Sequence, residues 1–145
     1  MEEILKRHKD NLILIAGNGG SMVNAIHLAL HLQDCGYRAI SLSDPAIITA
    51  RGNDFGMEAI FSSQISALGR QGDLFIAISG SGKSPDILVA LQAAEAWGLS
   101  TFVITMKKPY LALHYNKAGV GIDTEDMGIF EDKVSEFIHQ LKEKL

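Results

Sequence analysis

The sequence predicts an α/β fold, a doubly wound sheet with helices on both faces. Short apolar runs suited to buried strands alternate with longer segments suited to helices, and two of these runs lead directly into a glycine-rich loop that opens a helix. This alternation is typical of parallel strands joined by right-handed crossovers. With 145 residues, 47% of them apolar, the chain is expected to form a single domain over residues 1–145.

The first half of the chain contains two expected strands, both apolar and both followed by a break in the pattern. Gly36 is expected to end the helix between them, because glycine commonly follows the last helical residue. A polar turn is expected at 51–56. The expected elements are a short helix at 2–9, a strand at 12–16, a helix at 21–34, a strand at 37–42, a short helix from 43 through 50, and a helix at 56–68.

The second half repeats the alternation, and its pattern weakens after residue 107. The expected elements are a strand at 75–78, a helix from 85 to about 97, a strand at 100–105, a turn at 107–110, a short helix at 111–117, an edge strand at 119–122 and a final helix at 128–145. The final helix is amphipathic, and its expected apolar face consists of Ile129, Phe130, Val134, Phe137, Ile138 and Leu141.

The loop after the third expected strand, residues 79–84 (SGSGKS), has the composition of a phosphate site. Ser84 followed by Pro85 is an N-cap with proline at the first helical position, so a helix begins at the loop. A helix start presents unpaired backbone N–H groups and a partial positive charge to an anion. Ser79 and Ser81 add further hydroxyl groups, and the glycines between them let a ligand approach the backbone closely.

Two other interpretations of this loop are open. A glycine turn with a serine cap is a common strand-to-helix connection that binds nothing. A nucleotide P-loop needs glycine five positions before Gly82, where Ala77 stands in the middle of the strand. The loop is also too short to wrap a triphosphate, so neither nucleoside triphosphate hydrolysis nor a nucleotide cofactor is expected.

Residues 17–21 (GNGGS) form a second glycine loop, directly after the first expected strand. Two strand–loop–helix units favour a ligand seated between them, because open parallel sheets bind at the carboxyl ends of strands where the strand order reverses direction. The dinucleotide fingerprint fits poorly, since Met22 occupies the place of its third glycine or alanine.

The helix at 21–34 carries apolar residues around most of its circumference. It is therefore expected to be covered by the sheet on one side and by a partner subunit on the other. A narrow polar stripe runs along it, formed by Asn24, His27, His31 and Asp34. His27 and His31 have the i, i+4 spacing that lets two imidazoles share a metal ion. The alternative, that both are core histidines bonded to carbonyl groups, stays open at this point.

Composition argues against several classes of function. A net charge of −4 with scattered basic residues argues against nucleic-acid binding. No apolar run approaches the ~20 residues of a membrane span, and the acidic start is unlike a signal peptide. Cys35 is the single cysteine, which excludes an intramolecular disulfide and a cysteine metal cluster and favours a cytoplasmic location.

Three motifs together resemble the sugar isomerase (SIS) domain, and within it the phosphoheptose isomerase group. They are GNGGS at 17–21, GNDFG at 52–56 and SGSGKSP at 79–85, in the order and at separations similar to those of that group. The resemblance runs from about residue 12 to 106. From the residues alone, Asp54 in the middle motif is either a helix cap or an acceptor for a sugar hydroxyl.

The resemblance implies a three-layer SIS fold with five parallel strands in a flavodoxin-like order. It also implies a homodimer or homotetramer whose sites are shared between subunits. The implied activity interconverts a ketose and an aldose phosphate, with sedoheptulose 7-phosphate as the usual substrate. The phosphate is expected on Ser79, Ser81 and Ser84, and the sugar on Asn18, Gly19, Gly20, Asn53 and Asp54. Ser21 and Gly80 are expected among the substrate-binding residues as well.

The expected catalytic set departs from the family pattern. His27 matches a metal-binding histidine, but the glutamate expected four residues on is His31. The glutamine and histidine expected on the final helix fall at Phe130 and Ile138, with His139 one position away. One hypothesis is an isomerase with His31 as base and His139, or a neighbouring subunit's histidine, as acid, with or without a divalent metal such as zinc on His27 and His31. The other is a non-catalytic phosphosugar-binding or regulatory protein-interaction module.

Overall fold

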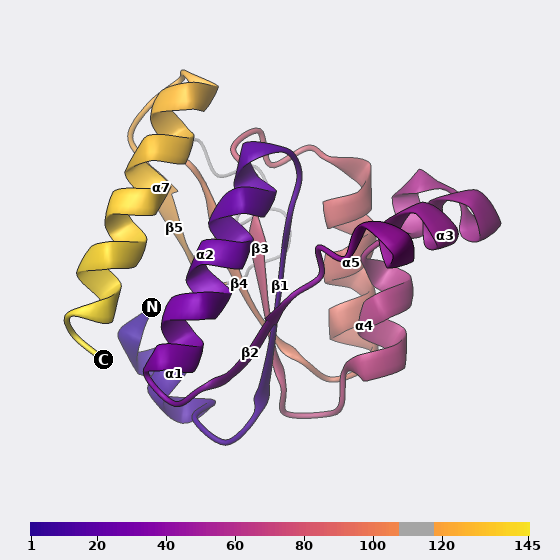
Figure 1. Ribbon diagram of the computed structural model, residues 1–145, viewed down its shortest axis with the longest axis horizontal. Coiled ribbons are helices and arrows are strands. Elements are labelled where there is room, and N and C mark those ends of the chain that lie inside the picture. Colours follow the sequence, from indigo (N-terminus) through magenta and orange to yellow (C-terminus); the bar gives the residue numbers. More distant parts are fainter. Residues whose placement is uncertain (108–117) are drawn as a thin grey trace.

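The computed structural model describes residues 1–107 and 118–145, so the expected helix at 111–117 and residues 108–110 of the expected turn lie outside the described residues. Within these ranges, five parallel strands form one sheet in the order β2-β1-β3-β4-β5 (Figure 1). The predicted five-stranded parallel sheet in flavodoxin-like order is therefore confirmed. The strands are β1 (Leu12–Gly17), β2 (Arg38–Ser41), β3 (Leu74–Ile78), β4 (Ser100–Met106) and β5 (Ala118–Ile122).

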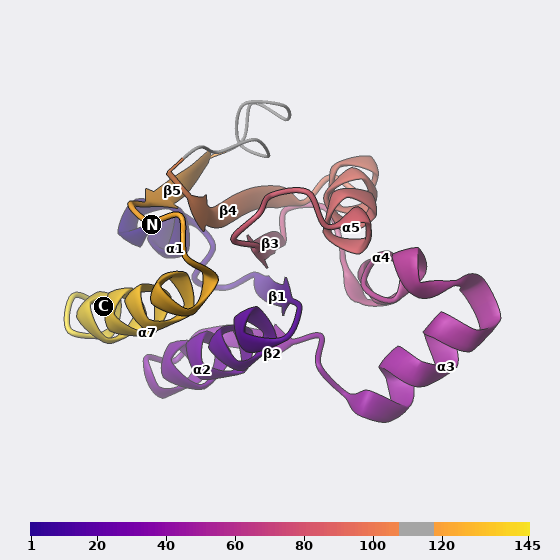
Figure 2. The ribbon, with the colours of Figure 1, turned by 90° about the horizontal axis from the view of Figure 1, so that it is seen from above.

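Helices of the described residues cover both faces of the sheet. The first face carries α1, α2 and α7, whereas α4 and α5 cover the second (Figure 2). This confirms the predicted three-layer arrangement. The helices are α1 (Glu2–Arg7), α2 (Gly20–Asp34), α3 (Pro45–Phe55), the 3₁₀ turn η1 (Met57–Ala59), α4 (Ser62–Leu68), α5 (Pro85–Ala96) and α7 (Met127–Lys142).

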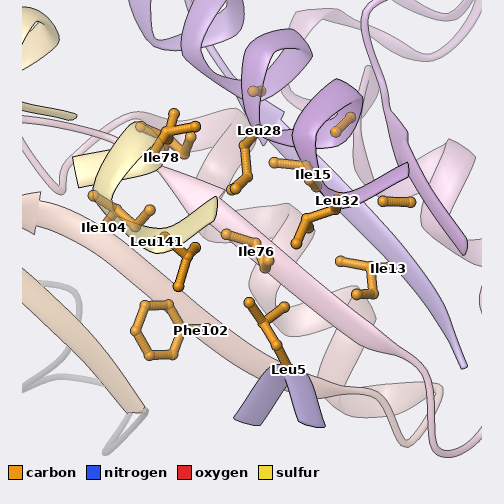
Figure 3. Close-up of a cluster of buried hydrophobic side chains, with 14 of the residues drawn as sticks. Leu5, Ile13, Ile15, Leu28, Leu32, Ile76, Ile78, Phe102, Ile104 and Leu141 are labelled. Carbon is orange, nitrogen blue, oxygen red and sulfur yellow. The ribbon is translucent and has the colours of Figure 1, made fainter. Parts of the chain in front are cut away.

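Each face of the sheet has its own apolar core, because successive strand residues point to opposite faces. Ile15 of β1 and Ile76 of β3 meet Leu28 and Leu32 of α2 on the first face (Figure 3). Phe75, the residue before Ile76 on β3, faces α4 and α5 on the second face. The central strands β1 and β3 are buried almost throughout, as the continuous apolar runs predict.

The segment between β2 and β3 differs from the expectation. The predicted polar turn at 51–56 is wrong, because residues 51–55 continue α3 as a helix and only Gly56 leaves it, with φ +88°. The predicted single helix at 56–68 is divided into η1 and α4. The structure describes every residue of α3, and none of them is buried. The helix projects from the side of the sheet (Figures 1 and 2).

The final helix packs as predicted, with one exception. Phe130, Val134, Ile138 and Leu141 are buried in the core of the first face. Ile129 does not belong to this face, since it is 49% exposed in the first turn of α7. None of the described helices has the combination of length and apolar character needed to cross a membrane.

Candidate functional site

A pocket of about 220 Å³ lies at the carboxyl ends of β1 and β3. These neighbouring strands send their following helices to opposite faces of the sheet, α2 to the first and α5 to the second. The strand order reverses direction here, which is where ligands bind in open α/β sheets. The lining residues come from the two glycine loops and from the start of α7: Asn18, Gly19, Gly20, Ser21, Ile78, Ser79, Gly80, Ser81, Ser84, Met127 and Glu131.

Two helices begin at the pocket without a side-chain cap. Of the four described helices longer than ten residues, α3 and α7 are capped by Asp44 and Asp126, which accept hydrogen bonds from Ile47 N–H and Ile129 N–H. At the starts of α2 and α5 no cap side chain is bonded in this way, although Ser84 occupies the cap position of α5. In α2, Ser21 N–H and Met22 N–H donate to the backbone oxygens of Asn18 and Gly19 at 3.0 Å. The first backbone N–H groups of α5 are therefore the ones available to an anion.

The serines of the second loop are arranged around the start of α5. Ser84 Oγ lies 3.5 Å from Ser79 Oγ, and Ser81 Oγ accepts a hydrogen bond of 3.2 Å from Lys83 N–H. The neighbouring backbone is anchored to β4, since Ser79 N–H donates to Ile104 O at 2.9 Å. Gly82 turns the chain with φ +64°, a conformation that favours glycine. The loop thus presents hydroxyl groups on a fixed backbone.

Gly17 allows the two loops to come together at the pocket. A Cβ atom at this position would lie 2.7 Å from the carbonyl oxygen of Ser21 and 2.9 Å from that of Ile78. Both are backbone atoms that cannot swing aside. A side-chain hydrogen bond of 3.0 Å from Asn18 Nδ2 to Asp86 Oδ1 ties the first loop to the first turn of α5.

Glu131 and Met127 line the pocket but were not among the expected site residues. Both lie at the start of α7, more than a hundred residues from the first glycine loop. The signal that could have found them is topological. In a doubly wound sheet every helix that follows a strand begins at the carboxyl edge, so the first turns of the final helix lie beside the site.

Asn53 and Asp54 are not part of this pocket. They are exposed in the last turn of α3, where Asn53 Nδ2 donates to Asp54 Oδ1 at 3.0 Å. Asp54 does not cap the following segment either, because Gly56 occupies that cap position. Within one chain, the second motif is therefore separate from the other two.

The structure brings His27, His31 and His139 together on the neighbouring helices α2 and α7. Their ring centroids lie 4.5, 4.8 and 5.5 Å apart, and one ligand nitrogen from each falls within 4.8 Å of the others. The sequence predicted the first two as a pair, and the meeting with His139 depends on how the two helices pack. These histidines do not line the pocket described above. His31 lies roughly 16 Å along the helix axis from Gly20, at 1.5 Å per residue.

The SIS domain model matches residues 5–106. The chain belongs to the SIS domain family. A curated relative, the phosphoheptose isomerase of Vibrio vulnificus, is 40% identical in an alignment of 105 positions that covers 68% of this chain and 55% of that protein. The chain thus spans about half the length of the curated relatives it matches.

Two solved phosphoheptose isomerases have the same fold as this SIS domain. The enzyme of Neisseria gonorrhoeae is 28% identical with a TM-score of 0.92, over 98% of this chain and 80% of that chain. The enzyme of Francisella tularensis is 27% identical with a TM-score of 0.88, over 98% of this chain and 81% of that chain. The predicted family membership is therefore confirmed.

The histidine cluster of this SIS domain has the chemistry of a metal site. Both ring nitrogens of His31 are buried and have no hydrogen-bond partner among the described residues. Its Nδ1 lies 3.7 Å from Asp34 Oδ2, which also accepts a hydrogen bond of 2.7 Å from Lys142 Nζ. The separation between Nδ1 and Oδ2 is too long for a hydrogen bond, so the Asp34 carboxylate lies beside the ring without orienting it.

Burial lowers the pKa of His27, and positive charge on His31, His139 and Lys142 lowers it further. His27 is therefore held in its neutral form, the form that binds a metal. The Lys142 hydrogen bond, by contrast, lowers the pKa of Asp34 and keeps that carboxylate charged. The three histidines thus fit a divalent transition metal such as zinc.

The depressed pKa of His27 predicts acid sensitivity of the metal-free protein. The unfolded chain takes up a proton as the pH falls through about 6.5, whereas folded His27 resists it. The free energy of unfolding, measured by urea titration with a chelator present, is therefore expected to decrease below this pH. His27→Gln should make the decrease shallower. An equally steep decrease in the variant would contradict the assignment.

Proposed function

We propose that this SIS domain binds a sugar monophosphate and interconverts its ketose and aldose forms, with sedoheptulose 7-phosphate as the substrate. The observation that carries the proposal is the pocket, in which the serine hydroxyls of one glycine loop meet the open start of α5. Curated relatives named phosphoheptose isomerase align with about two thirds of the chain and support this choice of substrate.

The phosphate belongs at the start of α5. Ser79, Ser81 and Ser84 supply hydroxyl donors there, and the first backbone N–H groups of the helix supply others. The sugar then extends toward the first loop, where Asn18 and the start of α2 offer polar groups for its hydroxyls. Asn53 and Asp54 lie outside the pocket of their own chain. They would therefore join such a site only in the pocket of another chain.

Aldose–ketose chemistry needs a base, an acid and a group that polarises the carbonyl. The roles of His31 as base and His139 as acid stay predictions. Both histidines lie outside the pocket of their own chain. They could act only on a substrate that is bound in the pocket of a second chain packed against them. The outer face of α2 supports such an assembly, since Val23, Ile26 and Leu30 are 65%, 49% and 53% exposed.

We also propose a divalent metal such as zinc on His27, His31 and His139. The unpartnered nitrogens of His31 and the depressed pKa of His27 support this assignment. Such an ion would act as a Lewis acid toward a ligand that reaches it. The protein's own contribution is to hold the three rings together across α2 and α7. A homodimer or homotetramer and a cytoplasmic location stay predictions.

A second candidate function is a non-catalytic phosphosugar-binding or regulatory module. It is favoured by Phe130 and Ile138, which are 0% and 1% exposed. The positions where the family resemblance expects a glutamine and a histidine are thus filled by core residues. A protein of this kind would bind the phosphate ester in the same pocket without converting it.

Solvent exchange separates the two candidates. The pure protein is incubated with sedoheptulose 7-phosphate in D₂O, and deuterium at C1 and C2 is followed by NMR. The isomerase proposal expects exchange together with formation of the aldose. Binding of the ester without exchange, for this and other ketose phosphates, would support the binding module and contradict catalysis.

A further inference from the structure

We infer that Glu131 is the catalytic carboxylate of this pocket, the group that carries the proton between C1 and C2 of the bound sugar phosphate. The inference rests on the isomerase activity proposed above. Among the described residues that line the pocket, Glu131 is the only one with an ionisable side chain. The remaining lining groups are hydroxyls, one amide, glycines and apolar side chains, none of which is a base near neutral pH.

The position of Glu131 is fixed by its surroundings on α7. The preceding residue, Phe130, is fully buried in the core, and Asp126 caps the helix one turn earlier. On the other side, Asn24 Nδ2 of α2 donates a hydrogen bond of 3.0 Å to the backbone oxygen of Glu131. These contacts fix the backbone of Glu131 beside the pocket, so that its side chain starts from a defined position, as a proton carrier requires.

The carboxylate of Glu131 reaches the first glycine loop because residue 20 has no side chain. A Cβ atom on Gly20 would lie 2.1 Å from both the carboxyl carbon and Oε2 of Glu131. The carboxylate thus occupies the space beside the start of α2, in the same pocket that the serines of residues 79–84 line. A ligand with its phosphate at the start of α5 would share this pocket with the Glu131 carboxylate.

The histidines are placed differently. His31 and His139 contact each other along α2 and α7, with ring centroids 5.5 Å apart, and neither lines the pocket. A substrate held in the pocket of one chain meets Glu131 of that chain, but it does not meet these histidines. Within one chain, Glu131 is therefore the ionisable group placed to transfer the proton, and His31 and His139 compete for this role only where a second chain brings them to the substrate.

The proposed step balances without a co-reactant. The Glu131 carboxylate takes a proton from C1 of the ketose, the C–H electron pair forms the C1=C2 bond, and the carbonyl oxygen on C2 gains a proton from solvent. The product of this half is an enediol. In the second half the carboxylic acid returns a proton to C2, the O1 hydroxyl loses its proton to solvent, and C1 becomes the aldehyde.

Glu131→Gln tests this role because glutamine keeps the size and the hydrogen-bonding oxygen of the side chain but is not a base. The rate of deuterium exchange into sedoheptulose 7-phosphate is expected to fall at least ~100-fold, the usual contribution of a general base. The dissociation constant of the ester, measured by calorimetry, should stay within about threefold of the wild-type value. Asp132→Asn, which removes an exposed carboxylate one residue away, is the matched control and should exchange at the wild-type rate.

Gly20→Ala provides a second, independent variant. Its Cβ displaces the Glu131 carboxylate, so exchange is expected to fall strongly in the wild-type background. In the Glu131→Gln background the same substitution should cost little more, because the base is already absent. Such non-additivity is the mark of two residues that act through one group. Fully multiplicative losses would contradict the inference.

The outcomes separate this inference from the proposed function. Exchange by Glu131→Gln within about threefold of wild type overturns the role of Glu131 while the isomerase stands. Loss of exchange in His31→Gln but not in Glu131→Gln also overturns the role of Glu131, and it assigns the base to the histidine cluster. A loss of ester binding in Glu131→Gln makes the residue a positioning group and overturns its catalytic role. Absence of exchange in the wild type overturns the isomerase proposal itself, and the inference with it.

Discussion

Phe130→Ala is expected to lower the free energy of unfolding by about 3–5 kcal/mol, the usual cost of truncating a buried phenylalanine to alanine. Phe130 is fully buried and belongs to the core that joins α7 to the sheet. Urea titration measures the change. Ile129→Ala is the matched control, because its side chain is 49% exposed and its truncation should cost less than about 1 kcal/mol.

This prediction matters for function because the family resemblance expects a glutamine at residue 130. In this chain the ring of Phe130 packs inward, and the adjacent residue, Glu131, faces the pocket instead. A cost at Phe130→Ala no larger than that at Ile129→Ala would mean that α7 does not pack as described. The placement of Glu131 in the pocket would then be wrong as well.

Zinc is expected to bind with one ion per chain and to stabilise the folded protein. A ligand present at 100 times its dissociation constant adds about 2.7 kcal/mol to the free energy of unfolding when it binds only the folded state. Calorimetry gives the stoichiometry, and thermal unfolding with and without a chelator gives the stabilisation. Cobalt in place of zinc reports the geometry of the site through its absorption spectrum.

His139→Gln should abolish most of this stabilisation, because it removes the ligand that α7 contributes to the cluster. His8→Gln is the matched control. His8 lies at the end of α1, where its ring nitrogen bonds to the backbone oxygen of Ile4 at 2.7 Å. Equal zinc stabilisation in wild type and His139→Gln would contradict the three-histidine site.

The fold and the serine-rich loop at the start of α5 could be predicted from the sequence because their signals are local. The continuous apolar runs of β1 and β3 predict buried parallel strands, and Ser84 followed by Pro85 marks the start of α5. The exception is residues 51–55. Glycine and polar side chains there predicted a turn, yet α3 continues through them as an exposed helix.

The rest of the site depends on how α2 and α7 pack together, which no local pattern encodes. The meeting of His139 with His27 follows from the register of these two helices. The contact between Glu131 and Gly20 follows from the same register. The glycine loop could be recognised as a ligand loop, but the sequence does not reveal that a carboxylate lies against its third glycine.

Calorimetric titration with sedoheptulose 7-phosphate tests most directly whether the pocket holds a monophosphate. The ester should bind the wild type, and free sedoheptulose at the same concentration should not. Ser84→Ala should weaken ester binding roughly 10-fold or more, since a hydrogen bond to a charged group contributes about 1.5–3 kcal/mol. Ser135→Ala, on α7 outside the pocket lining, should bind as the wild type does. Equal affinity for ester and free sugar, or an unchanged affinity in Ser84→Ala, would contradict a phosphate site at the start of α5.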